Sequence, residues 1–443
     1  MTEHRTVVDV WLAEHPFASF LDPMRKAAEE FGRAHPGHRV RIRAVDFREM
    51  PGEVARAAER GEPPAVAEYY ATAARIALDT RARDGRPLFT SIEAAIGGRA
   101  DILGEPVAID RIEAAARGHY AYGGELVSVP VTATTALLFA NATMLREAGV
   151  PRVPETWHEV EAACRAIARL PHGPSAAITW PDHGWLFQQA VASQGGLLAD
   201  HDNGRSGRAS TVDLSSAQMA AYVEWWRRLH RDGHYLYTGT RGDWGAAFDA
   251  FATGRVAFTV GSSIIAGAAV RAGREAGFDV EVARLPRNGD VPYAGNLVSG
   301  QSFWLADGLD EATRDGALAF IQFLLRPEVA AAWHKSAGFI PITVDSFDLL
   351  AKAGWFDEHP WLRVATDQLR AADGSPAALG ALLGDFAGIQ DVMTQAMEDV
   401  LVRAADPAGR FTRATADAQR LLDEYNADCR GPAPRTPRRL EVG

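Results

Sequence analysis

Short apolar runs alternate with longer segments of helical periodicity over most of this chain. Residues 6–12 and 39–45 have the composition and alternation of β-strands, whereas 23–35 and 50–60 repeat apolar side chains at helical spacing. Residues 65–68 are predicted to form a further short strand. Strands that alternate with helices in this way are typical of parallel sheets covered by helices. The pattern therefore predicts an α/β fold.

The alternation continues to residue 306, and the pattern is mostly helical from residue 310. A capping box at Thr156-Trp-His-Glu159 predicts a helix start, because its hydroxyl and carboxylate can satisfy free backbone amides there. We find no long linker, so we expect the domains to be joined by several short crossings. The expected strands are 125–131, 135–141, 255–260 and 301–306, and the expected helices are 156–167 and 215–230.

Composition and charge exclude several classes of protein. The chain of 443 residues is 47% hydrophobic and 23% charged, which is typical of a folded globular protein. Its 46 Lys and Arg against 57 Asp and Glu give a net charge of −11, so nucleic acid is not expected as the main partner. Cys164 and Cys429 are too few for a disulfide scaffold.

Membrane and export signals are absent from the sequence as it stands. No apolar run reaches the length of about 18 residues that a membrane span needs. The first residues lack the basic and apolar regions of a signal peptide. We therefore expect a cytoplasmic location, or a periplasmic or lipid-anchored extracellular one if the start is truncated.

Common enzyme signatures are also missing. No phosphate-binding glycine-rich loop follows an expected strand, and the chain has no zinc motif and no nucleophile elbow. Asp200-His-Asp-Asn-Gly204 is similar to the start of a calcium loop, but its fifth and sixth positions are Gly204 and Arg205, which offer no calcium ligand. We therefore expect no metal and no cofactor.

Two kinds of residue are candidates for ligand contact. Gly261-Ser262-Ser263 follows an expected strand, and such a turn presents hydroxyls and free amides at the carboxyl edge of a sheet, although a simple helix N-cap explains it equally well. Several aromatic residues lie at strand ends or in loops, where their rings can stack on a sugar or fill the core. They are Tyr69, Tyr70, Trp180, Trp185, Trp244 and Phe339.

Several stretches together resemble a known family. Three segments are similar to parts of family 1 solute-binding proteins, the ligand-capturing components of carbohydrate ABC importers. They are residues 131–149 with 154–157, residues 248–263 and residues 326–343. The resemblance covers about residues 6 to 425. It is closest to the glycerol-3-phosphate-binding branch, notably at residues 332–343.

This resemblance implies a periplasmic-binding-protein-like fold of the maltose-binding-protein type, with two α/β lobes joined by hinge strands. Lobe 1 would comprise residues 1–132 with about 285–325, and lobe 2 about 136–280 with 328–425. Residues 426–443 are expected to be a disordered tail. The ligand would lie between the lobes, which close on it.

The resemblance also implies ligand contacts, which are carried over position by position. The branch's stacking tryptophan matches Trp185, its serine Ser262 or Ser263, and its glycine Gly300. Tyr70 and Trp180 are added as aromatic candidates. The other matched positions are Phe47 and Phe339 for two tyrosines, Ala71 for an acid, Ala133 or Thr134 for a serine, and Leu382 for an arginine.

The replaced positions change the expected ligand. Leu382 stands where the branch has the arginine that meets phosphate, and a phosphate without its guanidinium loses a strong bidentate contact. We therefore expect a neutral ligand in place of glycerol-3-phosphate. It would be a sugar, glycoside or polyol.

Two functions remain open at this stage. The first is a monomeric substrate-binding component of an ABC importer, with a permease as partner. The second is an intracellular protein that reuses the fold as a biosynthetic enzyme or a ligand sensor, because a closed apolar pocket shifts carboxyl pKa values. A group of this kind is more often a solvated loop charge than a catalytic one. The candidates for acid–base chemistry are Glu14, Glu68, Asp182, Asp385, His15 and His183.

Overall fold

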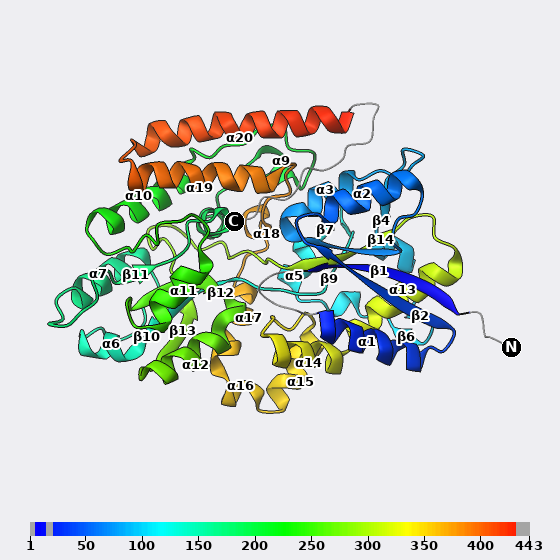
Figure 1. The fold of residues 1–443 in the computed structure, drawn as a ribbon, viewed down its shortest axis with the longest axis horizontal. Coiled ribbons are helices and arrows are strands. Elements are labelled where there is room, and N and C mark those ends of the chain that lie inside the picture. The colour runs from blue at the N-terminus through cyan, green and yellow to red at the C-terminus, as the bar shows by residue number, and fades with distance from the viewer. Residues whose placement is uncertain (1–4, 15–20, 431–443) are drawn as a thin grey trace.

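The computed structural model describes residues 5–14 and 21–430, which form two lobes, each built on its own β-sheet (Figure 1). Lobe 1, on the right in Figure 1, contains the first strands of the chain, and lobe 2, on the left, contains the middle of the chain. The predicted α/β class is therefore confirmed. None of the described helices is long and apolar enough to cross a membrane.

The lobe 1 sheet has six strands in the order β2-β1-β3-β14-β4, with β9 also paired to β14. Strands β1, β2 and β3 are parallel, whereas β14 runs antiparallel to β3. The bounds are β1 (Thr6–Glu14), β2 (His38–Asp46), β3 (Val66–Tyr70), β4 (Phe89–Thr90), β9 (Val129–Pro130), β14 (Gln301–Ala306), and for its helices α1 (Leu21–Ala34), α2 (Met50–Arg60), η1 (Ala71–Ala73), α3 (Ala74–Asp79), α5 (Ala114–His119) and α13 (Glu311–Leu324).

The lobe 2 sheet has four strands in the order β11-β12-β10-β13. Strand β10 is antiparallel to both of its neighbours. The bounds are β10 (Ala136–Asn141), β11 (Ile178–Thr179), β12 (Phe258–Ser262), β13 (Val280–Arg284), and for the helices α6 (Ala142–Glu147), α7 (Trp157–Ile167), α8 (Gly184–Ser193), α9 (Asp200–Gly204), α10 (Ala217–Arg231), α11 (Trp244–Ala252), η3 (Ser263–Ile265) and α12 (Ala266–Ala276).

The last part of the chain is helical, as predicted, and it covers both lobes. Helices α14 to α17 lie at the bottom of Figure 1, and α19 and α20 run along the top of lobe 2. The bounds are α14 (Pro327–Ala337), α15 (Val344–Lys352), α16 (Trp355–Glu358), η4 (Pro360–Leu362), α17 (Val364–Arg370), α18 (Pro376–Leu379), α19 (Phe386–Val402) and α20 (Pro407–Arg430).

Three expectations about the elements need correction. Both sheets are mixed instead of parallel, because β10 and β14 follow the crossings between lobes and enter each sheet against its neighbours. The expected strand 125–131 is two short pieces, β8 (Glu125–Leu126) and β9. Residues 426–430, expected in the tail, belong to α20, and residues 431–443 lie outside the described residues.

Local signals placed other elements correctly. The capping box at Thr156 and Glu159 starts α7, with both of its hydrogen bonds present. The core of lobe 2 contains a run of indole rings, in which Trp225 lies between Trp157 at 5.0 Å and Trp180 at 5.3 Å, with both pairs inclined by 10°. Stacked rings bury a large apolar area, which stabilises the core of lobe 2.

Candidate functional site

One group of predicted ligand contacts lies where the chain crosses between the lobes. Residues Thr134 and Ser299, one from each crossing, exchange backbone hydrogen bonds of 2.8 and 2.9 Å. The Tyr70 hydroxyl shares a hydrogen bond of 2.8 Å with the Ser299 hydroxyl. Gly300 has a φ of 135°, and a Cβ added there would lie 2.2 Å from the Thr132 carbonyl oxygen, so only glycine fits this crossing. Tyr70, Thr134 and Gly300 are thus brought together.

The serines that follow β12 lie at the same crossing. The Ser263 hydroxyl accepts a hydrogen bond of 3.2 Å from the Thr135 amide, and it is buried. The Ser262 hydroxyl accepts one of 3.5 Å from the Ile264 amide, as an N-cap does. The N-cap interpretation therefore accounts for Ser262, and the Ser263 hydroxyl holds the crossing.

Phe339 approaches this crossing from the loop after α14. It is 5% exposed, and its carbonyl accepts a hydrogen bond of 2.7 Å from His334 Nδ1. The next residue, Ile340, donates a backbone hydrogen bond of 2.9 Å to Ala133. The loop is thereby fixed against the crossing, which places Phe339 beside the first group.

A second group forms where the start of α19 meets both lobes. The start of α19 packs against η1 of lobe 1. It also packs closely against α8 of lobe 2. A Cβ atom added to Gly184 of α8 would lie only 2.4 Å from the Cβ of Gln390 of α19, so the two helices touch at this glycine. Trp185, the second residue of α8, is buried, and its ring centroid lies 5.9 Å from that of Trp244. Helix α19 therefore contacts one element of each lobe, and Trp185 lies at the start of the lobe 2 element.

Each of these converging elements has a buried polar atom without a hydrogen-bond partner in the described chain. Trp185 Nε1 and Gln188 Nε2 belong to α8, and Gln390 Nε2 belongs to α19. Thr72 Oγ1 belongs to η1. A buried polar atom without a partner costs about 1–3 kcal/mol, so such atoms are rare in native proteins. Several of them at one junction indicate a place that binds a polar molecule.

The apolar candidates Phe47 and Leu382 lie on the lobe 1 side of this junction. Both belong to one buried cluster that also includes Ala387 and Tyr425. The Arg48 guanidinium lies 5.1 Å from the centroid of the Phe47 ring. Leu382 is 7% exposed and its amide donates a hydrogen bond of 2.8 Å to Asn203. Leu382 is thus buried among apolar side chains.

Trp180, the remaining aromatic candidate, lies inside lobe 2. It is 1% exposed and packs against Trp225, Trp226 and Tyr235. Tyr235 donates a hydrogen bond of 2.6 Å to its carbonyl. This packing makes Trp180 a core residue.

The candidates for acid–base chemistry are spread over the molecule. Glu14 is exposed at the end of β1, and Asp385 precedes α19 with a φ of 47°. His183 caps α8, accepting a hydrogen bond of 3.1 Å from the Trp185 amide, and burial lowers its pKa to about 4. No hydrogen bond or ion pair in the described part of the chain joins any two of the candidates, and His15 lies outside that part.

Two of these carboxyl groups are fully buried. The Glu68 Oε2 atom accepts a hydrogen bond of 2.9 Å from the Ala13 amide, while Oε1 has no partner in the described chain. Burial raises the pKa of Glu68 to about 8, although that hydrogen bond opposes the shift. Burial also raises the pKa of Asp182 well above its ordinary value, and neither of its carboxylate oxygens has a partner there. Burial therefore favours the protonated, neutral form of both carboxyl groups.

Sequence reasoning missed Thr72, Gln188 and Gln390. Gln188 stands in the apolar run Trp185-Leu-Phe-Gln-Gln189, where a glutamine at helical spacing from a predicted ligand contact was the available signal. Thr72 and Gln390 lie far apart in the chain, and only the packing of η1 on α19 brings the two elements that carry them together. No local pattern connects them.

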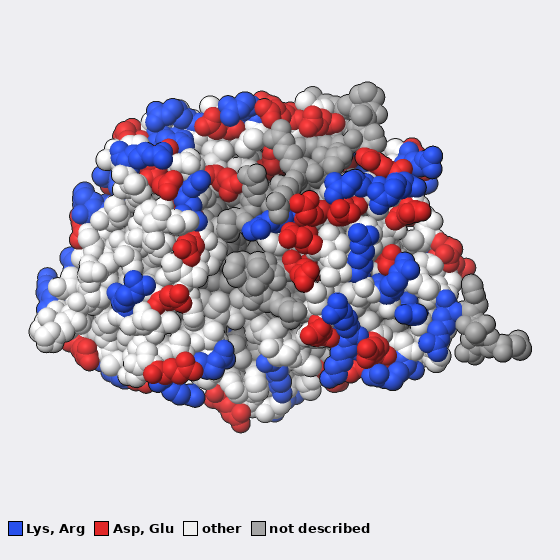
Figure 2. Space-filling model, viewed as in Figure 1, with Lys and Arg blue, Asp and Glu red and all other residues white. Residues whose placement is uncertain are grey.

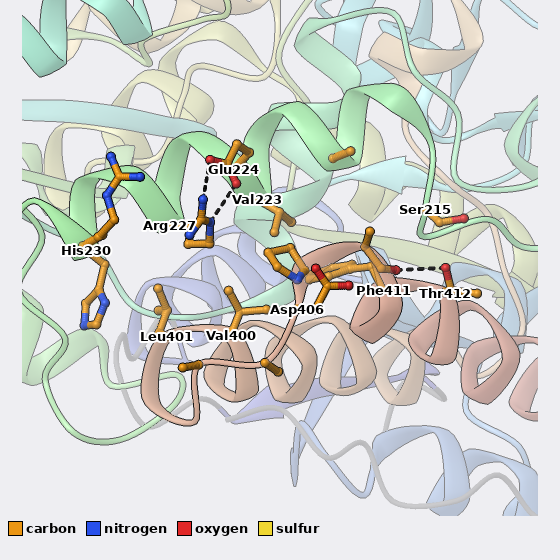
Figure 3. Close-up of a pocket in the computed structure, with 16 residues that line it drawn as sticks. Ser215, Val223, Glu224, Arg227, His230, Val400, Leu401, Asp406, Phe411 and Thr412 are labelled. Carbon is orange, nitrogen blue, oxygen red and sulfur yellow. Dashed lines mark hydrogen bonds and ion pairs between the residues drawn. The ribbon is translucent and has the colours of Figure 1, made fainter.

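A separate pocket of about 850 Å³ lies between α10 and the turn from α19 to α20 (Figure 3). Its wall includes the paired side chains Glu224 and Arg227, joined by hydrogen bonds of 2.7 and 2.8 Å. None of the predicted site residues lines it.

Figure 2 shows that many charged side chains cover lobe 1 on the face drawn, whereas lobe 2 has broad uncharged areas.

Comparisons with known proteins agree with the fold. A family model described as bacterial extracellular solute-binding protein matches residues 26–361. The sn-glycerol-3-phosphate-binding periplasmic protein of Yersinia enterocolitica is 25% identical over 407 residues, which is 90% of this chain and 88% of that protein.

Two solved structures have the same architecture. The sugar-binding protein MalE of Xanthomonas citri has a TM-score of 0.76 at 18% identity, covering 95% of this chain and 98% of that one. The Mycobacterium tuberculosis protein UgpB, in complex with glycerophosphocholine, has a TM-score of 0.70 at 22% identity, covering 94% and 98%. The expected two-lobed fold of the maltose-binding type is confirmed.

Proposed function

We propose, on the premise that this chain belongs to the bacterial extracellular solute-binding protein family, that it captures a small, mainly neutral molecule between its lobes for an ABC importer. The ligand would be a sugar, glycoside or polyol. The observation that carries the proposal is the packing of α19 against α8 and η1, three elements on which four buried polar atoms, Trp185 Nε1 among them, have no hydrogen-bond partner in the described chain. An indole face beside polar groups suits a molecule with CH-rich faces and hydroxyl edges.

The surroundings of Leu382 support a neutral ligand. The similar Yersinia protein is named for glycerol-3-phosphate, and the resemblance implies that the branch's arginine falls near Leu382. Here a leucine stands in an apolar cluster instead. A phosphate there would lose its charge-assisted contact and its water together, which costs several kcal/mol.

The lobe boundaries proposed for this function are 1–132 with about 285–325, and about 136–280 with 328–425. The pairing of β14 with β3 supports the return of the chain to lobe 1, and the packing of α19 and α20 on α8 and α10 supports the C-terminal helices in lobe 2. We further propose that the protein acts as a monomer and presents both lobes to the permease.

An enzymatic role has less support than binding. The buried Glu68 and Asp182 lie in different lobes, and the described contacts join neither to another candidate acid or base. General acid–base chemistry needs such groups within hydrogen-bond reach of one reacting atom.

A thermal-shift screen tests the ligand class. Maltose, glycerol, sn-glycerol 3-phosphate and glycerophosphocholine would be added separately to the full chain. A ligand that binds the folded state raises the melting temperature by mass action. We expect neutral sugars to raise it; a rise with the two phosphate esters alone would contradict the neutral ligand.

The Trp185→Ala substitution tests the site. Loss of the stacked ring should weaken binding of the ligand found in the screen by about 1–3 kcal/mol, measured by titration calorimetry. Trp361→Ala, which removes a half-buried indole in η4, is the matched control and should leave the affinity unchanged. Equal affinities for the two variants would remove Trp185 from the site.

A further inference from the structure

A left-handed turn in lobe 2 has no role in the ligand site described above. In α9, His201, Asp202 and Asn203 have φ values of 50°, 55° and 63°, followed by Gly204 at 78°. L-residues rarely adopt this conformation, and consecutive ones are rarer still. Such strain persists only where the surroundings enforce it, and it often marks a functional segment.

The surroundings of this turn do enforce it. The Asn203 carboxamide oxygen accepts hydrogen bonds from the amides of Leu198 at 2.7 Å and Ala199 at 3.1 Å. The Asn203 carbonyl accepts the Leu382 amide at 2.8 Å. A Cβ added to Gly204 would lie 2.4 Å from the Leu382 carbonyl oxygen. The turn is therefore locked in place, and it determines where the next residues point.

The first of these residues, Arg205, enters a cage made only of carbonyl groups. Its guanidinium donates hydrogen bonds to Gly118 at 3.3 Å and His119 at 3.2 Å, both at the end of α5 in lobe 1. It also donates to Gly380 at 2.6 Å and to Leu379, which follow α18. The planar guanidinium of Arg205, with its several N–H donors, thus connects the lobe 2 turn to lobe 1.

Arg208, three residues later, makes the second connection. It donates two hydrogen bonds, of 2.5 and 3.0 Å, to the carboxylate of Asp79 at the end of α3 in lobe 1. The same carboxylate accepts the Tyr425 hydroxyl of α20 at 3.0 Å. Within lobe 1 it is also bound by Arg75, at 2.6 and 2.9 Å. Asp79 is therefore shared between an arginine of its own lobe and two groups of lobe 2.

We propose that residues 200–208 are an interlobe clasp, in which a strained turn of lobe 2 inserts Arg205 and Arg208 into lobe 1 and holds the lobes together before any ligand arrives. A ligand that needs contacts from both lobes binds only the closed fraction of the protein. By keeping that fraction high, the clasp raises affinity, and its opening limits exchange of the ligand.

Small-angle X-ray scattering of the ligand-free full chain tests the clasp. Bound small molecules are removed first by denaturation, dialysis and refolding. Arg208→Gln removes the contact to Asp79 and a hydrogen bond of 3.2 Å to Asn426 of α20, while Asp79 keeps its partner Arg75. We expect a larger radius of gyration than that of the wild type. Adding Tyr425→Phe, which retains the ring and removes one hydroxyl, should increase it further.

The matched control is Arg228→Gln. Arg228 pairs with Glu161 at 2.8 Å inside lobe 2, and its side chain is 35% exposed against 32% for Arg208. Its radius of gyration should equal that of the wild type. Unchanged scattering from Arg208→Gln with Tyr425→Phe, or an equal expansion of the control, would overturn the clasp. Because no ligand is present, this result is independent of the thermal-shift screen.

Discussion

Two buried carboxyl groups of lobe 1 have opposite ionisation, although both lie near the lobe boundary. At Asp79, burial opposes ionisation, but the hydrogen bonds and charges of Arg75 and Arg208 outweigh it and hold the pKa below its ordinary value. At Glu68 no cation compensates, and burial raises the pKa to about 8. Burial alone therefore does not determine the charge of a group; its partners do.

The carboxyl groups of Asp79 and Glu68 also have different structural roles. The Asp79 carboxylate collects partners from α3, α20 and the segment after α9, so its charge joins the lobes. Glu68 bonds only to the amide of Ala13 on the neighbouring strand of its own sheet. A charge that is paired across a boundary resists separation of the two sides, whereas a neutral carboxyl group leaves them independent.

Removing the paired carboxylate should have the largest effect on stability. Asp79→Ala leaves the Arg75 and Arg208 guanidinium groups without their anion, and Arg75 has a side chain only 9% exposed. Breaking a buried pair from one side typically costs about 3–5 kcal/mol. We expect that loss in the free energy of unfolding in urea at pH 7. A loss below 1 kcal/mol would mean that the pair is solvated.

Glu68→Gln should remove a loss of stability that the wild type suffers as the pH rises. Because the folded pKa of Glu68 is raised, its contribution to stability is full below the unfolded pKa of about 4.3 and is lost as the pH rises through about 8. The variant removes this loss, so its stability relative to the wild type should rise by on the order of 4 kcal/mol between pH 5 and pH 9. Urea unfolding at both pH values measures it, and parallel pH profiles would contradict it. Asp79, with its lowered pKa, behaves oppositely and loses its contribution only on acidification below the unfolded pKa.

A surface pair provides the smallest expected effect. Asp367 pairs with Arg363 at 3.0 Å, and the two side chains are 34% and 52% exposed. Exposed pairs contribute about 0–1 kcal/mol, so Asp367→Ala should change the urea unfolding free energy by no more than that. A loss as large as that of Asp79→Ala would show that exposure does not distinguish the two pairs.

Much of the fold was predictable from local patterns. Alternating periodicities indicated the α/β class, and the Thr156 capping box identified the start of α7. The mixed strand directions could not be obtained in this way, because the direction of β14 depends on where the chain returns from lobe 2. Periodicity tells which side of an element is apolar, but not which element lies next to it.

The candidate site could likewise be predicted from the sequence only in part. Trp185, Gly300 and Tyr70 were found from the sequence, because strand ends and resemblance mark such positions. Thr72 of η1 and Gln390 of α19 lie more than 300 residues apart in the chain, and only tertiary packing brings these two elements together.

The sequence by itself determined the class of fold, the family and the position of the indole beside the lobe junction, since short-range spacing and residue type carry that information. Only the tertiary structure decided which buried carboxyl group is charged and which holds the lobes together. The reason is electrostatic: Arg75 on the same helix and Arg208, distant in the chain, together hold the pKa of Asp79 down, and Arg208 reaches it only after both lobes have folded.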